Sequence, residues 1–239
     1  MLLIRSVLFL VGQAVSSIFV CFLVVPALFV SSVKRAKIIG LWARFNIWTL
    51  RWICGVSYRV QGIDNLPDAP SIVIANHQST WETLCFQLIF PAQSYILKKE
   101  LFWIPFFGWG LAANRNIAID RSQKRKALNL LIEHSKERLD EGRWLMIFPE
   151  GTRMPPGELG EFQVGGAMMA SKTGAAVVPV AHNAGYCWPK NGIMKYPGVI
   201  DVIIGEPIDT EGMKPREINK IAEERVKALV ATLPSPNAS

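Results

Sequence analysis

The fold is decided by the segment Ile72-Val73-Ile74-Ala75-Asn76-His77-Gln78-Ser79-Thr80-Trp81-Glu82, which joins an apolar run to a polar turn. The apolar run is rich in β-branched residues and predicts a buried strand. Ser79 or Thr80 can cap the helix that follows, and Glu82 then falls near its first turn. His77 is therefore expected in a turn at the rim of a sheet, where the sites of α/β proteins usually form.

Similar apolar runs alternate with helical stretches from about Tyr58 onward. Strands are predicted at 58–61, 71–75, 94–97, 116–119, 144–148, 176–181 and 199–204. Helices are predicted at 80–90, 123–141, 165–173 and 214–233. Strands rich in valine and isoleucine between helices indicate an α/β fold, in which helices flank a mixed, largely parallel β-sheet. Pro179 is expected to place its strand at a sheet edge or to lie near the strand's end.

The composition favours a membrane-associated protein. The chain has 239 residues, half of them hydrophobic and 19% charged, which is more apolar than a typical soluble domain. The net charge of +7 suits a nucleic acid, an anionic membrane or a phosphorylated substrate, and the membrane fits best because the basic residues lie beside apolar stretches. The scattered cysteines, which are Cys21, Cys54, Cys85 and Cys187, predict buried reduced thiols and no metal site.

The N-terminal region 1–56 is expected to form a two-helix membrane anchor, followed by a catalytic domain at 57–239. Residues 6–33 carry no charge, and roughly 20 apolar residues suffice to cross a bilayer core as a helix. A cleaved signal peptide is the competing interpretation, but its apolar core is usually shorter. Lys34, Arg35 and Lys37 follow the run directly, which favours a retained anchor and a catalytic domain on the cytoplasmic side. Pro26 is expected to kink or end the first helix.

The second N-terminal segment, 38–54, combines tryptophans with cations. Lys37, Arg44 and Arg51 are spaced by seven residues and therefore share one face of a helix. A helix of this kind suits the headgroup layer of a membrane, although a core-packing helix with a solvated basic edge is the alternative. The first helix either spans the bilayer or forms a hairpin with the second helix within one leaflet.

His77 and Glu82 are the candidate catalytic pair. A carboxylate that holds one imidazole nitrogen fixes the tautomer and leaves the other nitrogen as a general base. The sequence has no Gly-x-Ser-x-Gly motif, so the proton would come from a substrate hydroxyl. The plainer alternative is a surface histidine beside a helix cap.

Two further segments predict an anion site next to an apolar one. The segment Phe148-Pro149-Glu150-Gly151-Thr152-Arg153 ends a strand, so its turn can present backbone N–H groups and Arg153 to a phosphate. The segment 98–109 places Lys98 beside an aromatic run, and 117–121 ends in Arg121. A phosphate with an acyl tail needs both kinds of surface.

In this order, these motifs resemble the lysophospholipid acyltransferase family, most closely the bacterial 1-acylglycerol-3-phosphate acyltransferases. The resemblance implies transfer of a fatty acyl group from acyl-CoA or acyl-carrier protein to the sn-2 hydroxyl of lysophosphatidic acid, giving phosphatidic acid at the cytoplasmic side of the inner membrane. It implies no cofactor and no metal. It assigns His77 as general base and Glu82 as its partner. It places the acceptor near Lys98, Arg121, Glu150, Gly151, Thr152 and Arg153, and links Pro179 to acyl-donor or structural roles.

Three positions depart from the family's pattern. Glu82 stands where aspartate is usual, and Gln163 lies where many relatives carry lysine. The segment Asn114-Arg115-Asn116 occupies the region where a glycine is common, a few residues before the Ile-Asp-Arg motif. Arg115 is expected to contact phosphate or to face water. The departures leave the reaction class in place and keep other lysophospholipid or lyso-amino-lipid acceptors open. An acyl-thioester hydrolase and a non-catalytic lipid-binding protein are the competing functions.

Overall fold

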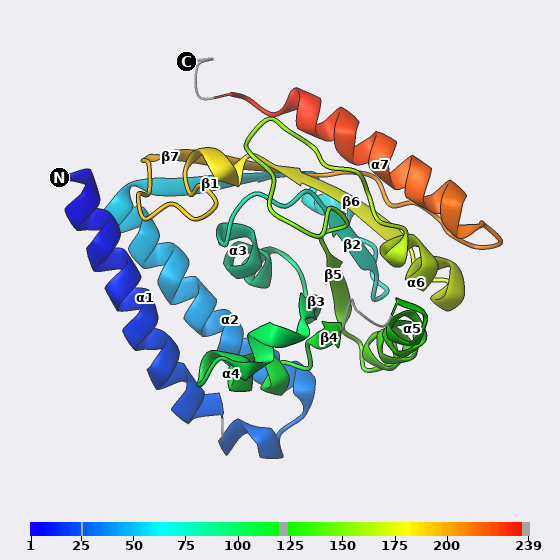
Figure 1. Ribbon diagram of the computed structural model, residues 1–239, viewed down its shortest axis with the longest axis horizontal. Helices are drawn as coiled ribbons and strands as arrows, with labels where there is room; N and C mark the ends of the chain where they lie inside the picture. Colours follow the sequence, from blue (N-terminus) through cyan, green and yellow to red (C-terminus); the bar gives the residue numbers. More distant parts are fainter. Residues whose placement is uncertain (25, 120–123, 236–239) are drawn as a thin grey trace.

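The computed structural model describes residues 1–24, 26–119 and 124–235, and its centre is a seven-stranded sheet (Figure 1). The strand order is β1-β7-β6-β2-β5-β3-β4. The strands are β1 (Val56–Gln61), β2 (Ile72–Ala75), β3 (Gln93–Lys98), β4 (Ile117–Ile119), β5 (Trp144–Ile147), β6 (Val177–His182) and β7 (Gly198–Ile204). Each predicted strand is present, with ends that differ by one or two residues.

The sheet is mixed and largely parallel, as the sequence predicts. Every pairing within it is parallel except that between β6 and β7. In the centre, β2 lies between β5 and β6, with Ile74 beside Ile147 on one side and Pro179 on the other. The carboxyl ends of β2, β3, β5 and β6 therefore meet at one edge of the sheet.

The four predicted helices are also present, as α3 (Trp81–Ile89), α5 (Lys124–Asp140), α6 (Gly165–Thr173) and α7 (Pro215–Thr232). Short 3-10 turns lie at Ile63–Asn65 and Ala184–Tyr186. The 3-10 helix η4 (Lys99–Trp103) and the helix α4 (Phe107–Ala113) that follows it were not predicted from the sequence. Both fall in the aromatic run, where Pro105, Gly108 and Gly110 obscure any helical pattern.

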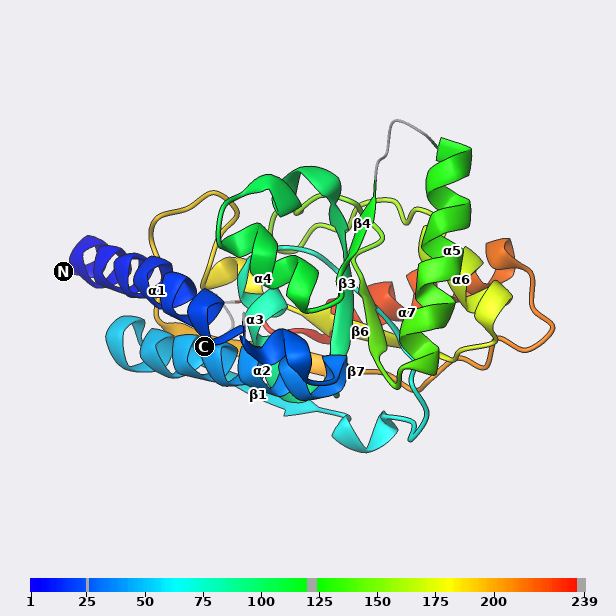
Figure 2. The same cartoon turned by 90° about the horizontal axis from the view of Figure 1, so that it is seen from below.

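The sheet is buried on both faces, which explains its apolar strands. Ile72 and Ile74 belong to a core cluster that contains residues of α5, α6 and α7. Val73 and Ala75 point to the opposite face and belong to a cluster with residues of the N-terminal helices and α3. Figures 1 and 2 show these two helical layers on either side of the sheet.

The N-terminal region forms two helices, α1 (Leu2–Val24) and α2 (Ser32–Thr49), joined by a 3-10 turn at Pro26–Phe29. A π-helical turn at Leu50–Cys54 ends α2. The first helix ends just before Pro26, as expected. It is long and apolar enough to cross a membrane, with a mean hydropathy of 2.5 and 17% of its apolar window buried.

These helices share a core with the sheet. Phe9 of α1 packs edge-on against Trp188, with ring centroids 5.3 Å apart. Ser6 accepts a hydrogen bond from the backbone N–H of Lys195 at 2.9 Å. One core cluster therefore includes residues from both sides of position 56.

Two buried arginines fasten the N-terminal helices to the rest of the chain. Arg143 donates to the carbonyls of Ser32 (2.9 Å) and Asn114 (2.7 Å) and to Oγ of Ser94 (2.9 Å). Burial lowers the pKa of Arg143 to about 10, so its guanidinium remains charged at neutral pH. Arg35, which the sequence places in a basic cluster after the first helix, turns inward and donates to the carbonyl of Ala113 at 2.9 Å. Arg35 therefore stabilises the fold and is not available to a membrane surface.

Pro179 corrects one expectation. It lies inside β6, which is fully buried and central, and not at an edge or a strand end. Its carbonyl accepts a hydrogen bond from the N–H of Gly205 at 2.8 Å, just after β7 ends at Ile204. The N–H that proline lacks would point to this same side, where the β6–β7 ladder begins only at Val180. Pro179 lies opposite Gly205 in the register of this ladder, so the missing N–H removes only the reciprocal bond at the end of the β6–β7 pairing.

Candidate active site

The predicted site residues meet at the carboxyl edge of the sheet. His77 follows β2, the turn 148–153 follows β5, and Lys98 ends β3. These three strands are parallel neighbours, so the segments after them lie side by side.

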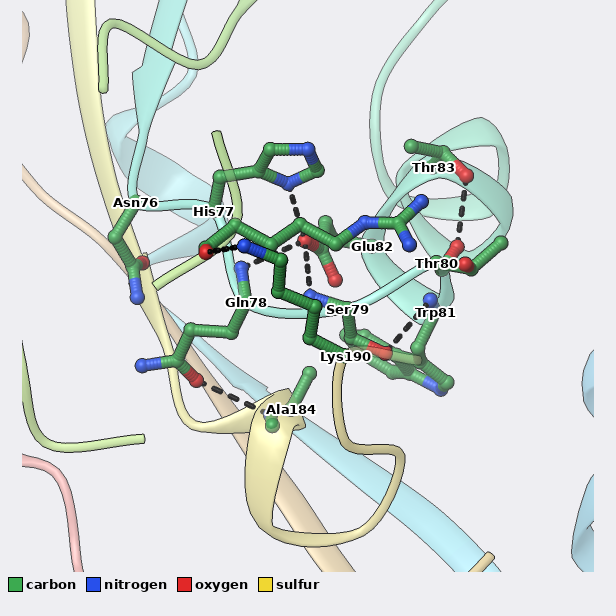
Figure 3. A network of polar contacts seen from close by, with 12 residues as sticks. Asn76, His77, Gln78, Ser79, Thr80, Trp81, Glu82, Thr83, Ala184 and Lys190 are labelled. Carbon is green, nitrogen blue, oxygen red and sulfur yellow. Dashed lines mark hydrogen bonds and ion pairs between the residues drawn. The ribbon is translucent and has the colours of Figure 1, made fainter. Parts of the chain in front are cut away.

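His77 and Glu82 form a hydrogen-bonded pair (Figure 3). Nδ1 of His77 lies 2.7 Å from Oε1 of Glu82, and the same oxygen accepts from the backbone N–H groups of Gln78 (3.0 Å) and Ser79 (2.8 Å). The Glu82 side chain is fully buried, whereas that of His77 is 17% exposed. The other ring nitrogen of His77 points away from Glu82 (Figure 3). A short turn before α3 thus folds the carboxylate back onto the imidazole, as the sequence analysis expects.

The surroundings keep Glu82 ionised. Burial alone would raise the pKa of Glu82, but the nearby His182, the hydrogen bond from His77 and the N–H of Ser79 together bring it below its ordinary value. Since an ionised carboxylate only accepts, Nδ1 of His77 donates, and in the neutral imidazole Nε2 is therefore the nitrogen with the free lone pair. The pair therefore has the arrangement of a general base and its orienting group.

A second buried histidine, to which the sequence analysis assigned no role, lies behind the pair. Nε2 of His182 donates to the carbonyl of Asn76 at 2.8 Å and lies 3.9 Å from Oε1 of Glu82. The Asn76 amide in turn bonds the backbone of His182 at 2.9 and 3.0 Å. Burial lowers the pKa of His182, and the negative charge of Glu82 opposes this shift. Its position at the end of a buried strand, like that of His77, was the signal available in the sequence.

The turn after β5 is fixed directly to His77. Phe148 stacks on the imidazole, with ring centroids 4.2 Å apart and planes inclined by 12°. The Glu150 carboxylate accepts from the N–H groups of His77 (2.7 Å) and Gly160 (2.8 Å). Burial raises the pKa of Glu150, while these two hydrogen bonds oppose the shift. Glu150 therefore holds two loops together.

Gly151 allows the turn itself. Its φ of 68° is a left-handed conformation that favours glycine, and its N–H closes the turn onto the carbonyl of Phe148 at 3.1 Å. That N–H is consequently engaged within the turn and is not directed at an anion.

A cavity of about 780 Å³ opens beside His77. At its polar end lie Lys98, Thr152 and Arg153. Its apolar part runs between α1, α2 and α4, where Leu10, Ala14, Val20, Trp42 and Leu111 line it. Among the described residues that line it, none is acidic. The cavity thus offers cations and an apolar channel next to a general base.

A third cation at the cavity, Lys190, was not identified from the sequence. Its Nζ donates to the carbonyl of Arg153 at 2.8 Å and contacts Oγ1 of Thr152 at 3.3 Å. It comes from the loop after the turn Ala184–Tyr186, which carries no motif, and Figure 3 shows it reaching across the His77 turn. Only the tertiary fold brings it to the site.

Two of the residues expected near the acceptor lie away from the cavity, and a third lies outside the described residues. Glu150 does not line the cavity, because its carboxylate faces backbone N–H groups. Arg121 lies outside the described residues. Arg115 forms ion pairs with Glu137 and Glu141, which occupy its guanidinium. Within the described part of the chain, no group of three histidine, cysteine or acidic side chains could hold a metal ion.

The sequence model of the acyltransferase family matches residues 57–183, which include His77, Glu82 and the turn at 148–153. The chain belongs to the acyltransferase family. It is 47% identical to the 1-acyl-sn-glycerol-3-phosphate acyltransferase of Pseudomonas aeruginosa over 80% of this chain and 76% of the relative. It is 33% identical to the enzyme of the same description from Saccharomyces cerevisiae, over 80% of this chain and 64% of the relative.

A solved structure extends the likeness to the N-terminal helices. The crystal structure of the 1-acyl-sn-glycerophosphate acyltransferase PlsC from Thermotoga maritima superposes with a TM-score of 0.81 at 29% identity, covering 98% of both chains. The acyltransferase therefore shares its whole architecture, α1 and α2 included, with that protein. This kinship and the apolar α1 are consistent with membrane association.

Proposed function

We propose that this acyltransferase moves a fatty acyl group from acyl-CoA or acyl-carrier protein to the sn-2 hydroxyl of lysophosphatidic acid, and so forms phosphatidic acid. The observation that carries the proposal is a single cavity that joins the His77–Glu82 pair, three cations and an apolar channel. The named relatives act on this acceptor class according to their descriptions.

The chemical step follows from the geometry of the pair. Nε2 of His77 removes the proton of the acceptor hydroxyl while its oxygen attacks the thioester carbonyl. The tetrahedral intermediate collapses, the C–S bond breaks, and the acyl group stays on the acceptor oxygen. The Glu82 carboxylate stabilises the imidazolium, which then gives its proton to the departing thiolate or to solvent. This route needs no metal, cofactor or covalent enzyme intermediate.

The cations give the acceptor its orientation. Lys98, Arg153 and Lys190 line the same cavity as His77, and a phosphate held among them places the neighbouring glycerol hydroxyl at the imidazole. A phosphate suits this end because no acidic side chain among the described lining residues opposes it.

The apolar channel suits an acyl chain. It is bounded by α1, α2 and α4, and α1 also exposes large apolar side chains such as Phe19 and Phe22 to the outside. We place these helices in the cytoplasmic side of the inner membrane, with the catalytic domain in the cytoplasm, because Lys34 and Lys37 follow the apolar helix.

The purified full-length protein tests the proposal when it is assayed with acyl-CoA and acyl-carrier-protein donors against a panel of lysolipids. We expect phosphatidic acid to form faster than the product of any neutral or amino-lipid acceptor. A higher rate with another lysolipid would move the proposal to that acceptor. Release of free fatty acid at the same rate with and without acceptor would favour a hydrolase instead.

Replacing the cavity cations should weaken binding of phosphorylated acceptors selectively. We expect Arg153→Ala and Lys190→Ala each to raise KM for lysophosphatidic acid by about tenfold or more, because charge-assisted hydrogen bonds to the phosphate are lost. With a monoacylglycerol acceptor the change should be small. Lys190→Arg should largely restore KM.

The matched control is Lys172→Ala, which removes the same charge from an exposed position on α6. It should leave KM unchanged for both lysophosphatidic acid and the monoacylglycerol. An equal effect of Lys190→Ala on phosphorylated and neutral acceptors would show that Lys190 only fastens the loop at Thr152 and Arg153.

A further inference from the structure

The segment formed by η4 and α4 exposes a group of large apolar side chains. Trp103 is 71% exposed, Trp109 58%, Ile104 45% and Phe107 41%. They lie within seven consecutive residues, whereas a water-facing surface usually exposes such side chains singly. Their exposure calls for a partner that buries apolar surface.

The backbone holds these side chains outward. Phe106 has φ 63° and ψ −59°, and the N–H of Phe107 donates to the carbonyl of Pro105 at 2.7 Å, which makes a γ-turn of the rare, strained kind. A Cβ added to Gly108 would lie 2.2 Å from the carbonyl oxygen of Phe102, so the two backbones touch. The exposed arrangement is therefore built into the backbone of the segment.

The segment is fastened to α1 and continues its apolar surface. Sγ of Cys21 donates to the carbonyl of Phe106 at 2.8 Å. Val24, Leu28 and Trp109 line one small groove of about 360 Å³ between α1, its following turn and α4. Figure 1 places α4 beside the C-terminal half of α1. A partner that buries the outer face of α1 near its C-terminal end therefore also contacts Trp109.

Cations accompany the aromatic rings. Lys98 is exposed next to the segment, and Nζ of Lys99 lies 6.0 Å from the centre of the Trp103 ring. Tryptophan beside lysine suits the headgroup layer, where the rings sit at the apolar boundary and the ammonium groups meet lipid phosphates.

We propose that η4 and α4 form a second membrane contact, in which Trp103 and Trp109 lie in the headgroup layer of an anionic bilayer beside α1. This inference rests on the proposed function, because it takes α1 to be in the membrane. It goes beyond it by assigning a lipid contact to the catalytic domain itself.

The proposed contact provides a path for the acceptor from the membrane to the active site. The inner side of the same segment, through Leu101, Phe106 and Leu111, lines the cavity that contains His77. Phe107 is both exposed and part of the cavity wall. A lysolipid can therefore pass from the leaflet across the rim at Phe107 to the site without crossing water.

A fluorescent probe attached to single cysteines tests the contact directly. Trp109→Cys in the full-length protein is labelled with an environment-sensitive dye and mixed with vesicles of phosphatidylcholine and phosphatidylglycerol. The control is Val199→Cys, which is 44% exposed on β7. The unsubstituted protein corrects for its four buried native thiols. We expect a blue shift and quenching by headgroup-labelled lipid at position 109, and neither at position 199.

An unshifted dye at position 109 on vesicles that carry active enzyme would overturn the proposal. So would a blue shift that appears without vesicles and increases with protein concentration, because a second copy of the chain would then cover the face.

Activity provides a second readout. We expect the double variant Trp103→Ser, Trp109→Ser to lose about tenfold in rate with acceptor embedded in vesicles, while the rate in detergent micelles changes less than twofold. The control Val199→Ser should change neither the rate on vesicles nor the rate in micelles. Equal rates of the double variant and the unsubstituted protein on vesicles would overturn the proposal. Absence of transfer in both media with the unsubstituted protein would instead contradict the proposed function.

Discussion

His77→Ala is expected to lower the rate of acyl transfer by about 10²–10⁴-fold, the range that a positioned general base contributes. Among the described residues that line the cavity, no other histidine and no carboxylate could replace it, and Nε2 of His77 is the ring nitrogen that the Glu82 hydrogen bond leaves free for the acceptor hydroxyl. Rates with lysophosphatidic acid and either acyl donor, measured at saturating concentrations, check this prediction.

Binding of the lysolipid should survive the substitution, because the cations at the polar end of the cavity are unchanged. The control is His134→Ala, which removes a 44% exposed histidine of α5 and should leave the rate intact. A His77→Ala protein that is folded and retains most of its activity would contradict the assignment of the general base.

Glu82→Gln is the second substitution for which we expect a large loss, about 10³-fold in the maximal rate. A glutamine keeps the size and an oxygen that can accept from Gln78 and Ser79, but it lacks the charge that stabilises the imidazolium. It also permits the wrong tautomer of His77, because an amide N–H can donate to Nδ1. The measurement is the maximal rate together with KM for the acceptor, which should change little.

Glu82→Asp separates charge from length. Aspartate retains the carboxylate but withdraws it by one methylene from the three groups that Oε1 now contacts. We expect the aspartate variant to be impaired much less than the glutamine variant. Equal losses in both would show that the position of the oxygen matters and its charge does not.

The sheet could be predicted from the sequence because its strands carry their own signal. A strand buried on both faces, such as Val177–His182, is a continuous apolar run that ends in polar residues. The turn between β2 and α3 could also be predicted, because the groups that fold Glu82 onto His77 lie within a few residues of one another. The expected pairing of His77 and Glu82 therefore agrees with the geometry of the structure.

The rest depended on contacts between distant segments. Lys190 reaches the site because its loop bonds the carbonyl of Arg153, and no spacing in the sequence indicates that. Arg35 was counted in the basic cluster after the first helix, yet it bonds backbone carbonyls. Arg115 was expected to contact phosphate or to face water, yet it pairs with acids of α5 and its C-terminal end. The helix α4 begins after a left-handed residue, Phe106, whose conformation no propensity predicts.

The packing of α1 has a consequence for how the protein is made. Ser6 is hydrogen-bonded to Lys195, which lies 189 residues later in the chain. Phe9 packs against Trp188, which is also far along the sequence. During synthesis the first helix leaves the ribosome long before either partner exists. Its inward face stays without its final contacts until the last quarter of the chain is translated. If α1 enters a membrane early, as proposed above, the lipid would also protect it from aggregation while the polypeptide is completed.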